Sequence, residues 1–296
     1  MVLYLTKLLD KFFQNLYIRR LFSNLEVFYL NKFNKICQDI KNIKIQGAEN
    51  IAKSALIAYS INPTKKAVKK LIGLRPTEPL LVNILNYAVK NNVKDALNLL
   101  NKNEEKITKY GARLIKNNSV IFTHCHSTTV INILKEAKKQ GRKFQVYNTE
   151  TRPLYQGRKT ALDLAKLKIK TTSIVDSAAH FAIKKSNLML IGADAILRNG
   201  DVINKIGSGL FSELAYAHKL PVYIASNGLK FSNKDVKIEE RSFKEVWRNS
   251  PKEIKIKNPA FEVIDNRYIK AIISEFGILK IKDFLNKVKL SYPWLK

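Results

Sequence analysis

The stretch Leu188–Gly209 (LMLIGADAILRNGDVINKIGSG) is the part of the sequence around which the rest of the chain is organised. An apolar run ends in Gly-Ala-Asp, whose carboxylate is Asp194, and an Asn-Gly turn pair follows. We expect a buried strand, a turn, and then a helix that Asp201 caps and whose first turns carry Asn204 and Lys205. A helix start has free N–H groups, and glycine lets a ligand approach the backbone closely. The stretch therefore predicts a site for a phosphorylated small molecule.

The composition is that of a folded, strongly basic chain. Its 296 residues are 46% hydrophobic, enough for one large or two modest domains. The formal net charge is +29, but the lysines are scattered and form no arginine-rich tract, so we expect no nucleic-acid partner. The positive charge of the chain would still attract an anionic substrate. Two cysteines, Cys37 and Cys125, exclude a disulfide scaffold and suit a reducing compartment.

Residues 1–22 (MVLYLTKLLDKFFQNLYIRRLF) are apolar but interrupted by charges. The apolar runs are shorter than a membrane span, and no small-residue cleavage site follows. We therefore expect an amphipathic helix that packs on the domain or on another subunit, no membrane partner, and a cytoplasmic location.

The spacing of apolar residues along the sequence changes near residue 110. Before it, apolar residues recur at helical spacing, which predicts an all-helical domain over residues 1–110. After it, short β-branched runs alternate with helical stretches, which predicts an α/β domain over residues 111–296 with a Rossmann-like, doubly wound parallel sheet. The expected strands are Ser119–Thr123, Phe144–Tyr147, Thr171–Val175, Leu188–Ile191 and Pro221–Ala225. The expected helices are Thr129–Gln140, Arg158–Lys168, Ala178–Lys185, Val202–His218 and a surface helix from Lys280. We expect Glu262–Phe276 to be a further strand or helix that closes the sheet.

Polar side chains follow all five expected strands. The exits read HCHS (124–127), NTETR (148–152), DS (176–177), GAD (192–194) and SNG (226–228). In doubly wound sheets, ligands bind beyond the carboxyl ends of the strands. A cysteine, an arginine and several acids on one such rim favour an enzyme-like pocket over a purely structural sheet.

Cys125 lies between two histidines directly after the first expected strand. It is either a reactive thiol, whose pKa the histidines and the next helix start would lower, or a small buried hydrophobe. Position alone leaves both interpretations open. Zinc bound with His124 and His126 is a third, which we disfavour because adjacent strand residues point to opposite faces. We therefore expect no metal and no cofactor.

Asp194 has two interpretations as well. It is a turn former, or a partly buried carboxyl whose pKa rises and that shares acid–base work with a thiol. The helix start at Ser127–Thr129 and Lys230 are further candidate anion sites, and several such sites on one rim suggest a doubly phosphorylated ligand.

The polar loop after the second expected strand contains both structural and ligand-binding candidates. We interpret Glu150 and Arg152 as a structural Glu–Arg pairing, and Gln156 as a ligand contact.

Several segments resemble one family. ETRPLYQGRKTALDLA, IVDSAAHFAI, IGADAILRNGDVINKIGSG, IEERSFKEV and NPAFEVID are similar to the superfamily of the initiation factor 2B alpha, beta and delta subunits. That superfamily also contains methylthioribose-1-phosphate isomerase and archaeal ribose-1,5-bisphosphate isomerase, and THCHS around Cys125 is most similar to the latter. The resemblance runs from about Ile45. It implies a helical domain before a Rossmann-like one, and a homodimer or a hexamer of dimers.

The resemblance also implies a reaction. Cys125 and Asp194 would be the acid–base pair that converts ribose 1,5-bisphosphate to ribulose 1,5-bisphosphate in AMP metabolism, without a cofactor. The implied substrate-binding residues, together with Gln156, are Gln46, Gly47, Ala48, Glu49, Arg75, Ser127, Thr128, Thr129, Asn204, Lys205 and Lys230.

The segment Gln46–Glu49 departs from the isomerases, which usually have Arg-Gly-Ala-Gly there. Losing an arginine and gaining a carboxylate weakens the binding of a dianion. Two alternatives therefore stay open. One is a non-catalytic initiation factor 2B-like subunit that binds initiation factor 2 or nucleotides. The other is a methylthioribose-1-phosphate isomerase, which needs an apolar slot for the thioether and has less use for Lys230.

Overall fold

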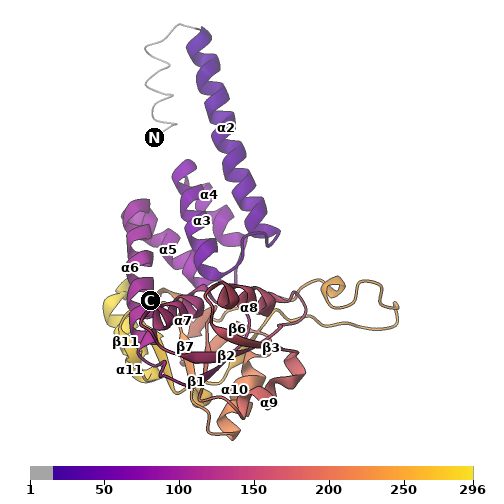
Figure 1. Cartoon of the computed structure of the whole chain (residues 1–296). Helices are drawn as coiled ribbons and strands as arrows, with labels where there is room; N and C mark the ends of the chain where they lie inside the picture. The colour runs from indigo at the N-terminus through magenta and orange to yellow at the C-terminus, as the bar shows by residue number, and fades with distance from the viewer. Residues whose placement is uncertain (1–15, 296) are drawn as a thin grey trace.

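The computed structural model describes residues 16–295, with side chains from residue 28 onward. The first part of this range is helical, as predicted (Figure 1). Its helices are α2 (Leu16–Lys41), α3 (Ala48–Ile61), α4 (Lys65–Gly73), α5 (Pro79–Lys90) and α6 (Val93–Ala112). The amphipathic helix predicted for residues 1–22 lies mostly outside the described residues. None of the described helices is both long and apolar enough to cross a membrane.

The helical part is held by a shared apolar core and by local caps. Leu56 of α3, Leu81 of α5 and Leu100 of α6 are fully buried against one another's helices. The Oγ1 atom of Thr64 accepts the Ala67 N–H at 3.1 Å and so begins α4. These contacts place the starts of α3 and α5 next to the sheet (Figure 1).

The main sheet has seven strands in the order β3-β2-β1-β4-β7-β10-β11. All its neighbouring strands are parallel except the β10–β11 pair. The strands are β1 (Ser119–Thr123), β2 (Phe144–Thr149), β3 (Lys170–Ile174), β4 (Leu188–Ile191), β7 (Val222–Ala225), β10 (Ala271–Ser274) and β11 (Gly277–Leu279). All five predicted strands are present within two residues at either end. The described chain is therefore α/β, with a helical first part and a parallel-rich sheet.

The prediction of one helix over Val202–His218 is wrong. Val202–Lys205 forms β6, which pairs antiparallel with β5 (Ala195–Leu197) and with β9 (Phe261–Ile264) in a second sheet that also contains β8 (Phe231–Ser232). The Asn-Gly pair at 199–200 makes a hairpin turn, with Gly200 at φ +91°, instead of leading into a helix. The helix α10 (Ser208–Ala217) starts only after Gly207.

Asp201, which we expected to cap that helix, has another role. Its Oδ1 atom accepts the Asn266 N–H at 2.9 Å and ties the hairpin to the chain after β9.

The C-terminal region also differs from the prediction. Glu262–Phe276 contains two strands in different sheets, β9 and β10. The predicted surface helix, α11 (Ile281–Ser291), buries Phe284 and Val288 fully against the core, because its apolar residues fall four apart on one face. Three further predicted helices are present within two residues at either end: α7 (Thr128–Lys139), α8 (Gln156–Lys166) and α9 (Ala179–Ile183), which follows the 3₁₀ turn Asp176–Ala178.

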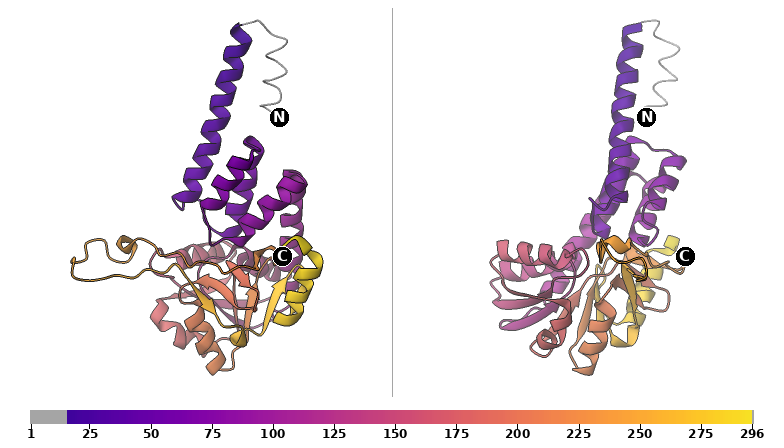
Figure 2. Two further views of the ribbon diagram at one scale, coloured as in Figure 1. Left: turned by 180° about the vertical axis from the view of Figure 1, so that it is seen from behind. Right: turned by 90° about the vertical axis from the view of Figure 1, so that its right-hand side faces the viewer.

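Residues 233–258 form a long excursion from the body of the molecule (Figure 2). Its base lies near the connection between α4 and α5, since Glu239 lies 3.6 Å from Arg75. The excursion thus brings charged side chains from late in the sequence to the helical part.

Gly157, in the first turn of α8, is the tightest glycine. A Cβ atom there would lie 1.8 Å from the Thr149 carbonyl oxygen. We expect Gly157→Ala to lower the free energy of unfolding by about 1–3 kcal/mol, because backbone has to move. Chemical denaturation measures this, with Gly73→Ala as the control: that helical glycine has open space around it, so its substitution is expected to be neutral or stabilising. Equal effects of the two variants would contradict this packing.

Candidate active site

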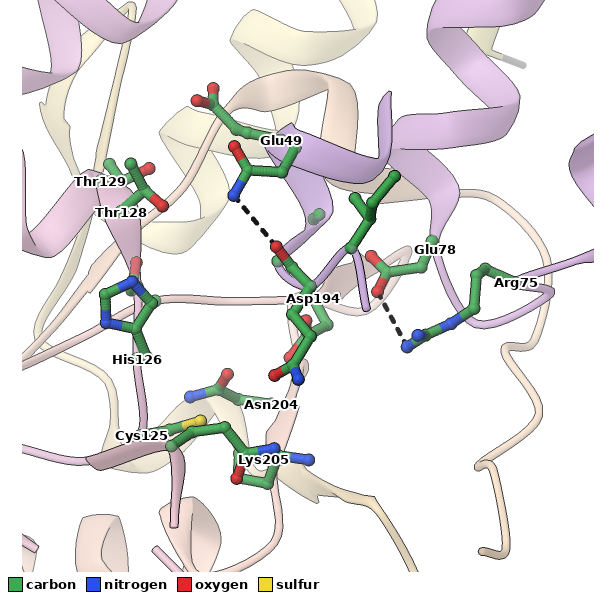
Figure 3. Close-up of a pocket in the computed structure, with 18 of the residues that line it drawn as sticks. Glu49, Arg75, Glu78, Cys125, His126, Thr128, Thr129, Asp194, Asn204 and Lys205 are labelled. Atoms are coloured by element: carbon green, nitrogen blue, oxygen red, sulfur yellow. Dashed lines mark hydrogen bonds and ion pairs between the residues drawn. The ribbon is translucent and has the colours of Figure 1, made fainter. Parts of the chain in front are cut away.

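A pocket of about 590 Å³ lies between the helical part and the carboxyl ends of β1 and β4. Its walls come from the starts of α3, α5, α7 and α8, from β6, and from the chain after β7 (Figure 3). The structure places all the residues singled out from the sequence in this lining: Gln46, Gly47, Ala48, Glu49, Arg75, Cys125, Ser127, Thr128, Thr129, Gln156, Asp194, Asn204, Lys205 and Lys230.

Cys125 follows β1 in a left-handed conformation, with φ 64°. Residues other than glycine adopt this region at a cost, so the surroundings have to hold it. The Cys125 N–H donates to Thr151 Oγ1 at 3.0 Å, and its carbonyl accepts from Thr160 Oγ1 at 2.8 Å. Two hydroxyls from different elements therefore orient the residue, whose sulfur lies near Asn204 and Lys205 in Figure 3.

The expectation that the histidines lower the pKa of Cys125 is wrong. Burial raises the pKa of the thiol to about 11, and the nearby Lys205 only partly opposes this. Burial also lowers the pKa of His124 and of His126 to about 4, so both are neutral at pH 7 and supply no positive charge. Cys125 therefore carries its proton at neutral pH.

The two histidines have different surroundings. His124 is buried, with Nε2 2.9 Å from the Ile206 carbonyl and Nδ1 2.5 Å from Thr149 Oγ1, so it joins two strand exits. His126 lines the pocket and lies 3.0 Å from Thr160 Oγ1. Within residues 16–295, no group of three or more His, Cys, Asp or Glu side chains has the arrangement of a metal site.

Asp194 follows β4, and its N–H donates to the Ile203 carbonyl at 2.8 Å. Burial raises the pKa of its carboxyl, as predicted, while Lys230, Lys205 and Arg75 lower it. Three cations therefore act electrostatically on this partly buried carboxyl. Lys205 acts on both Asp194 and Cys125, so one ammonium group neighbours both candidate catalytic residues.

Asn204 and Lys205 line the pocket from β6 rather than from a helix start. The Asn204 amide donates to Ser208 Oγ at 3.0 Å, and the Lys205 ammonium lies 4.7 Å from the centre of the Phe261 ring. Lys230 is buried, and its Nζ donates to the Ala193 carbonyl at 2.6 Å. Two buried ammonium groups on rigid elements make this side of the pocket suited to an anion.

Two helix starts also open into the pocket. Ser127 caps α7, with its Oγ 3.4 Å from the Val130 N–H, which confirms the helix start predicted there. Gly47, at φ 84°, precedes α3. Both starts present N–H groups that favour anions.

Arg75 is buried between two carboxylates. Its Nη2 lies 3.5 Å from Glu78 Oε1 and 3.6 Å from Glu239 Oε2. Glu78 was not singled out from the sequence, although it lines the pocket. Burial and the neighbouring Asp194 raise its pKa to about 8, whereas Arg75 and Lys230 oppose the shift. The Arg75 guanidinium is therefore already in contact with carboxyl groups of the protein (Figure 3).

Glu49 is buried in the first turn of α3 and lines the pocket. Lys53 lies 3.9 Å from its Oε2 atom. Burial raises the pKa of Glu49 to about 7, and Glu104 on α6 is the next largest cause. Glu104 itself accepts from Thr129 Oγ1 at 3.1 Å and from the Asn132 amide at 2.9 Å, so it connects α6 to α7.

The loop before α8 differs in its pairing from the prediction. Glu150 pairs with Arg158 at 2.8 Å, and not with Arg152, which donates instead to the Tyr155 hydroxyl and the Val246 carbonyl. Arg158 lies one turn into α8 and so reaches back to the loop. Gln156 lines the pocket, and its Oε1 has no hydrogen-bond partner among the described residues.

The fold and this site define an α/β protein with a cation-rich pocket for a small anionic ligand. The chain belongs to the initiation factor 2 subunit family, whose model matches residues 31–281. It is 35% identical to ribose 1,5-bisphosphate isomerase from Methanocaldococcus jannaschii over 88% of this chain and 95% of that one. It is 32% identical to methylthioribose-1-phosphate isomerase from Fervidobacterium nodosum over 84% and 75% of the two chains. The solved structure of the Pyrococcus horikoshii translation initiation factor eIF-2B has a TM-score of 0.76, with 25% identity over 84% of this chain and 96% of that one.

Proposed function

We propose that the protein is a sugar-phosphate isomerase that converts ribose 1,5-bisphosphate to ribulose 1,5-bisphosphate. One observation carries the proposal: Cys125 and Asp194 lie in one pocket, at the ends of adjacent strands β1 and β4, with Lys205 beside both. The likeness to isomerases of ribose 1,5-bisphosphate supports the choice of substrate. We also regard the main sheet as Rossmann-like, since the pocket lies at the carboxyl ends of its central parallel strands.

The reaction requires one bond to break and two protons to move. The bond between C1 and the ring oxygen breaks, and the ring oxygen takes up a proton. C2 loses its hydrogen as a proton, the C2 hydroxyl loses its proton and becomes the ketone, and C1 gains a proton, so that two protons are taken up and two are released. No oxidant or reductant is consumed, so an acid and a base suffice.

The surroundings of the two residues assign their starting roles. Cys125 begins as the acid, because burial keeps the proton on its thiol at neutral pH, and it protonates the ring oxygen. We assign Asp194 the role of the base that accepts the proton leaving C2. Burial raises the pKa of its carboxyl, and Lys230, Lys205 and Arg75 act in the opposite direction, toward the carboxylate. Lys205 and Asn204 stabilise the negative charge that develops on the sugar oxygens.

A second candidate is 5-methylthioribose 1-phosphate. Its single phosphate would suit a pocket in which Arg75 is already paired with two carboxylates, and a relative isomerises this sugar. Turnover of both sugars by the purified full chain decides between them. We expect a higher kcat/KM for ribose 1,5-bisphosphate. A higher kcat/KM for 5-methylthioribose 1-phosphate would make that sugar the substrate instead. No turnover of either, with specific recovery of initiation factor 2 from cell extract, would replace the function with that of a translation-factor subunit.

Lys230→Met tests the contribution of a buried ammonium to phosphate binding. We expect KM for ribose 1,5-bisphosphate to rise by about 10- to 100-fold, because a charged hydrogen bond contributes about 1.5–3 kcal/mol. Steady-state kinetics measure this. Lys234→Met, at an exposed position four residues later, is the control and should leave KM within twofold. An unchanged KM in both variants would remove Lys230 from the phosphate site.

A further inference from the structure

Glu49 is an unusual group to find in a pocket for phosphates. Its side chain is buried, with 7% of the residue exposed, and its Oε1 atom has no hydrogen-bond partner among the described residues. An ionised carboxylate there would repel a phosphate dianion at the start of α3. A protonated carboxyl is neutral, and its hydroxyl is a hydrogen-bond donor.

From this geometry we propose that Glu49 is a specificity residue that admits a phosphate dianion only when its carboxyl is protonated, so that phosphate binding takes up a proton. The inference rests on the proposed function only in taking the pocket to hold phosphate groups. It concerns the binding step and is independent of the acid–base pair.

The groups around Glu49 explain why it holds a proton. Glu104 from α6 faces it, and Lys53 from α3 and Lys230 from the chain after β7 are the cations that lower its pKa most. Lys53 is 3.9 Å away and is partly exposed. Lys230 already donates to the Ala193 carbonyl. Neither cation therefore makes a close ion pair with Glu49.

The Glu104 side chain is fixed by hydrogen bonds to α7. Both of its oxygens accept hydrogen bonds from α7, from Thr129 and Asn132. Two buried carboxylates that face one another cannot both ionise without strong repulsion. The proton is therefore held on the Glu49 side, consistent with a Glu49 pKa raised to about 7 by burial and by Glu104.

The sign of the pH effect follows from linkage. A phosphate that binds only beside protonated Glu49 raises the pKa of that carboxyl further, so binding takes up a proton near pH 7 and weakens as the pH rises above it. In the free protein, the raised pKa means that ionisation of Glu49 opposes folding at higher pH. Removing that ionisation should therefore stabilise the folded chain above pH 8.

The test is a calorimetric titration of the full chain with sulfate, which is a dianion at every pH used, at constant ionic strength. For the wild type we expect Kd to rise by about tenfold or more from pH 6.5 to pH 8.5, with proton uptake visible as a dependence on buffer ionisation enthalpy. In Glu49→Gln, a neutral donor of the same shape, Kd should change less than twofold and the uptake should vanish. Thermal unfolding at pH 8.5 should show this variant to be folded and more stable than the wild type.

Glu105→Gln is the matched control, since Glu105 is exposed on α6 next to Glu104. It should keep the pH dependence of the wild type, including any sulfate bound elsewhere on the basic surface. A pH dependence in Glu49→Gln equal to that of the wild type, or no sulfate site in the pocket at either pH, would overturn the proposal. Sulfate binding requires no turnover, so failure of the isomerase proposal appears separately, in the assay of ribose 1,5-bisphosphate.

Discussion

Cys125→Ser is expected to lower kcat for ribose 1,5-bisphosphate by about 10²- to 10⁴-fold, the usual contribution of a positioned acid or base. Serine preserves the shape of the side chain, and the bonds that orient residue 125 involve only its backbone. Its hydroxyl is, however, a much weaker acid than a thiol and protonates the ring oxygen poorly. Because Cys125 bears no charge at neutral pH, KM should change little.

The control for this variant is the chain's other cysteine. Cys37 is buried in the helical part, away from the pocket, so Cys37→Ser should lower the free energy of unfolding but leave kcat within twofold. Steady-state kinetics with direct detection of the ketose measure both variants. A Cys125→Ser enzyme with a kcat within threefold of the wild type would mean that another group protonates the ring oxygen.

Asp194→Asn is expected to lower kcat by a similar factor, about 10²- to 10⁴-fold, and to lower KM as well. The amide cannot accept the proton from the sugar. The substitution also removes a negative charge beside Lys230 and Lys205, so these two ammonium groups attract the substrate phosphates more strongly. The opposite movement expected for Lys230→Met separates the two kinds of residue: the cation binds phosphate, whereas the carboxyl acts on the sugar.

The exposed Asp235→Asn is the matched control, because it removes the same charge outside the pocket. Its kcat and KM should equal those of the wild type. If Asp194→Asn raised KM and kept kcat, Asp194 would be a binding group, and the base would have to be sought elsewhere. Glu78, the buried carboxyl that neighbours it, would be the next candidate.

The helices and strands predicted best were those that a single local sequence pattern determines. The buried apolar run at 188–191 is β4, and the Ser127 cap begins α7. The Asn-Gly pair at 199–200 misled the prediction, because a hairpin and a helix approach both begin with such a turn. The partner strand β9 lies about sixty residues later, so nothing local distinguished the two.

The electrostatics of the site were the part that local sequence could not supply. The thiol pKa was expected to fall, but it rises, because burial outweighs the single ammonium beside it and the flanking histidines stay neutral. Glu239 reaches Arg75 only through the long excursion of the chain. Glu78 follows the Arg-Pro-Thr segment directly, so its nearness to Arg75 in the sequence was the available signal for it.

The most direct test of the central claim is to incubate ribose 1,5-bisphosphate with the purified full chain in D₂O and to follow the sugar by ¹³C NMR. Proton transfer between the sugar carbons through Cys125 and Asp194 predicts ribulose 1,5-bisphosphate with deuterium at C1, and no such product with Cys125→Ser or Asp194→Asn over the same time. An absence of ketose with a chain that binds the sugar would contradict isomerisation, and ketose formed at the wild-type rate by both variants would contradict the acid–base step.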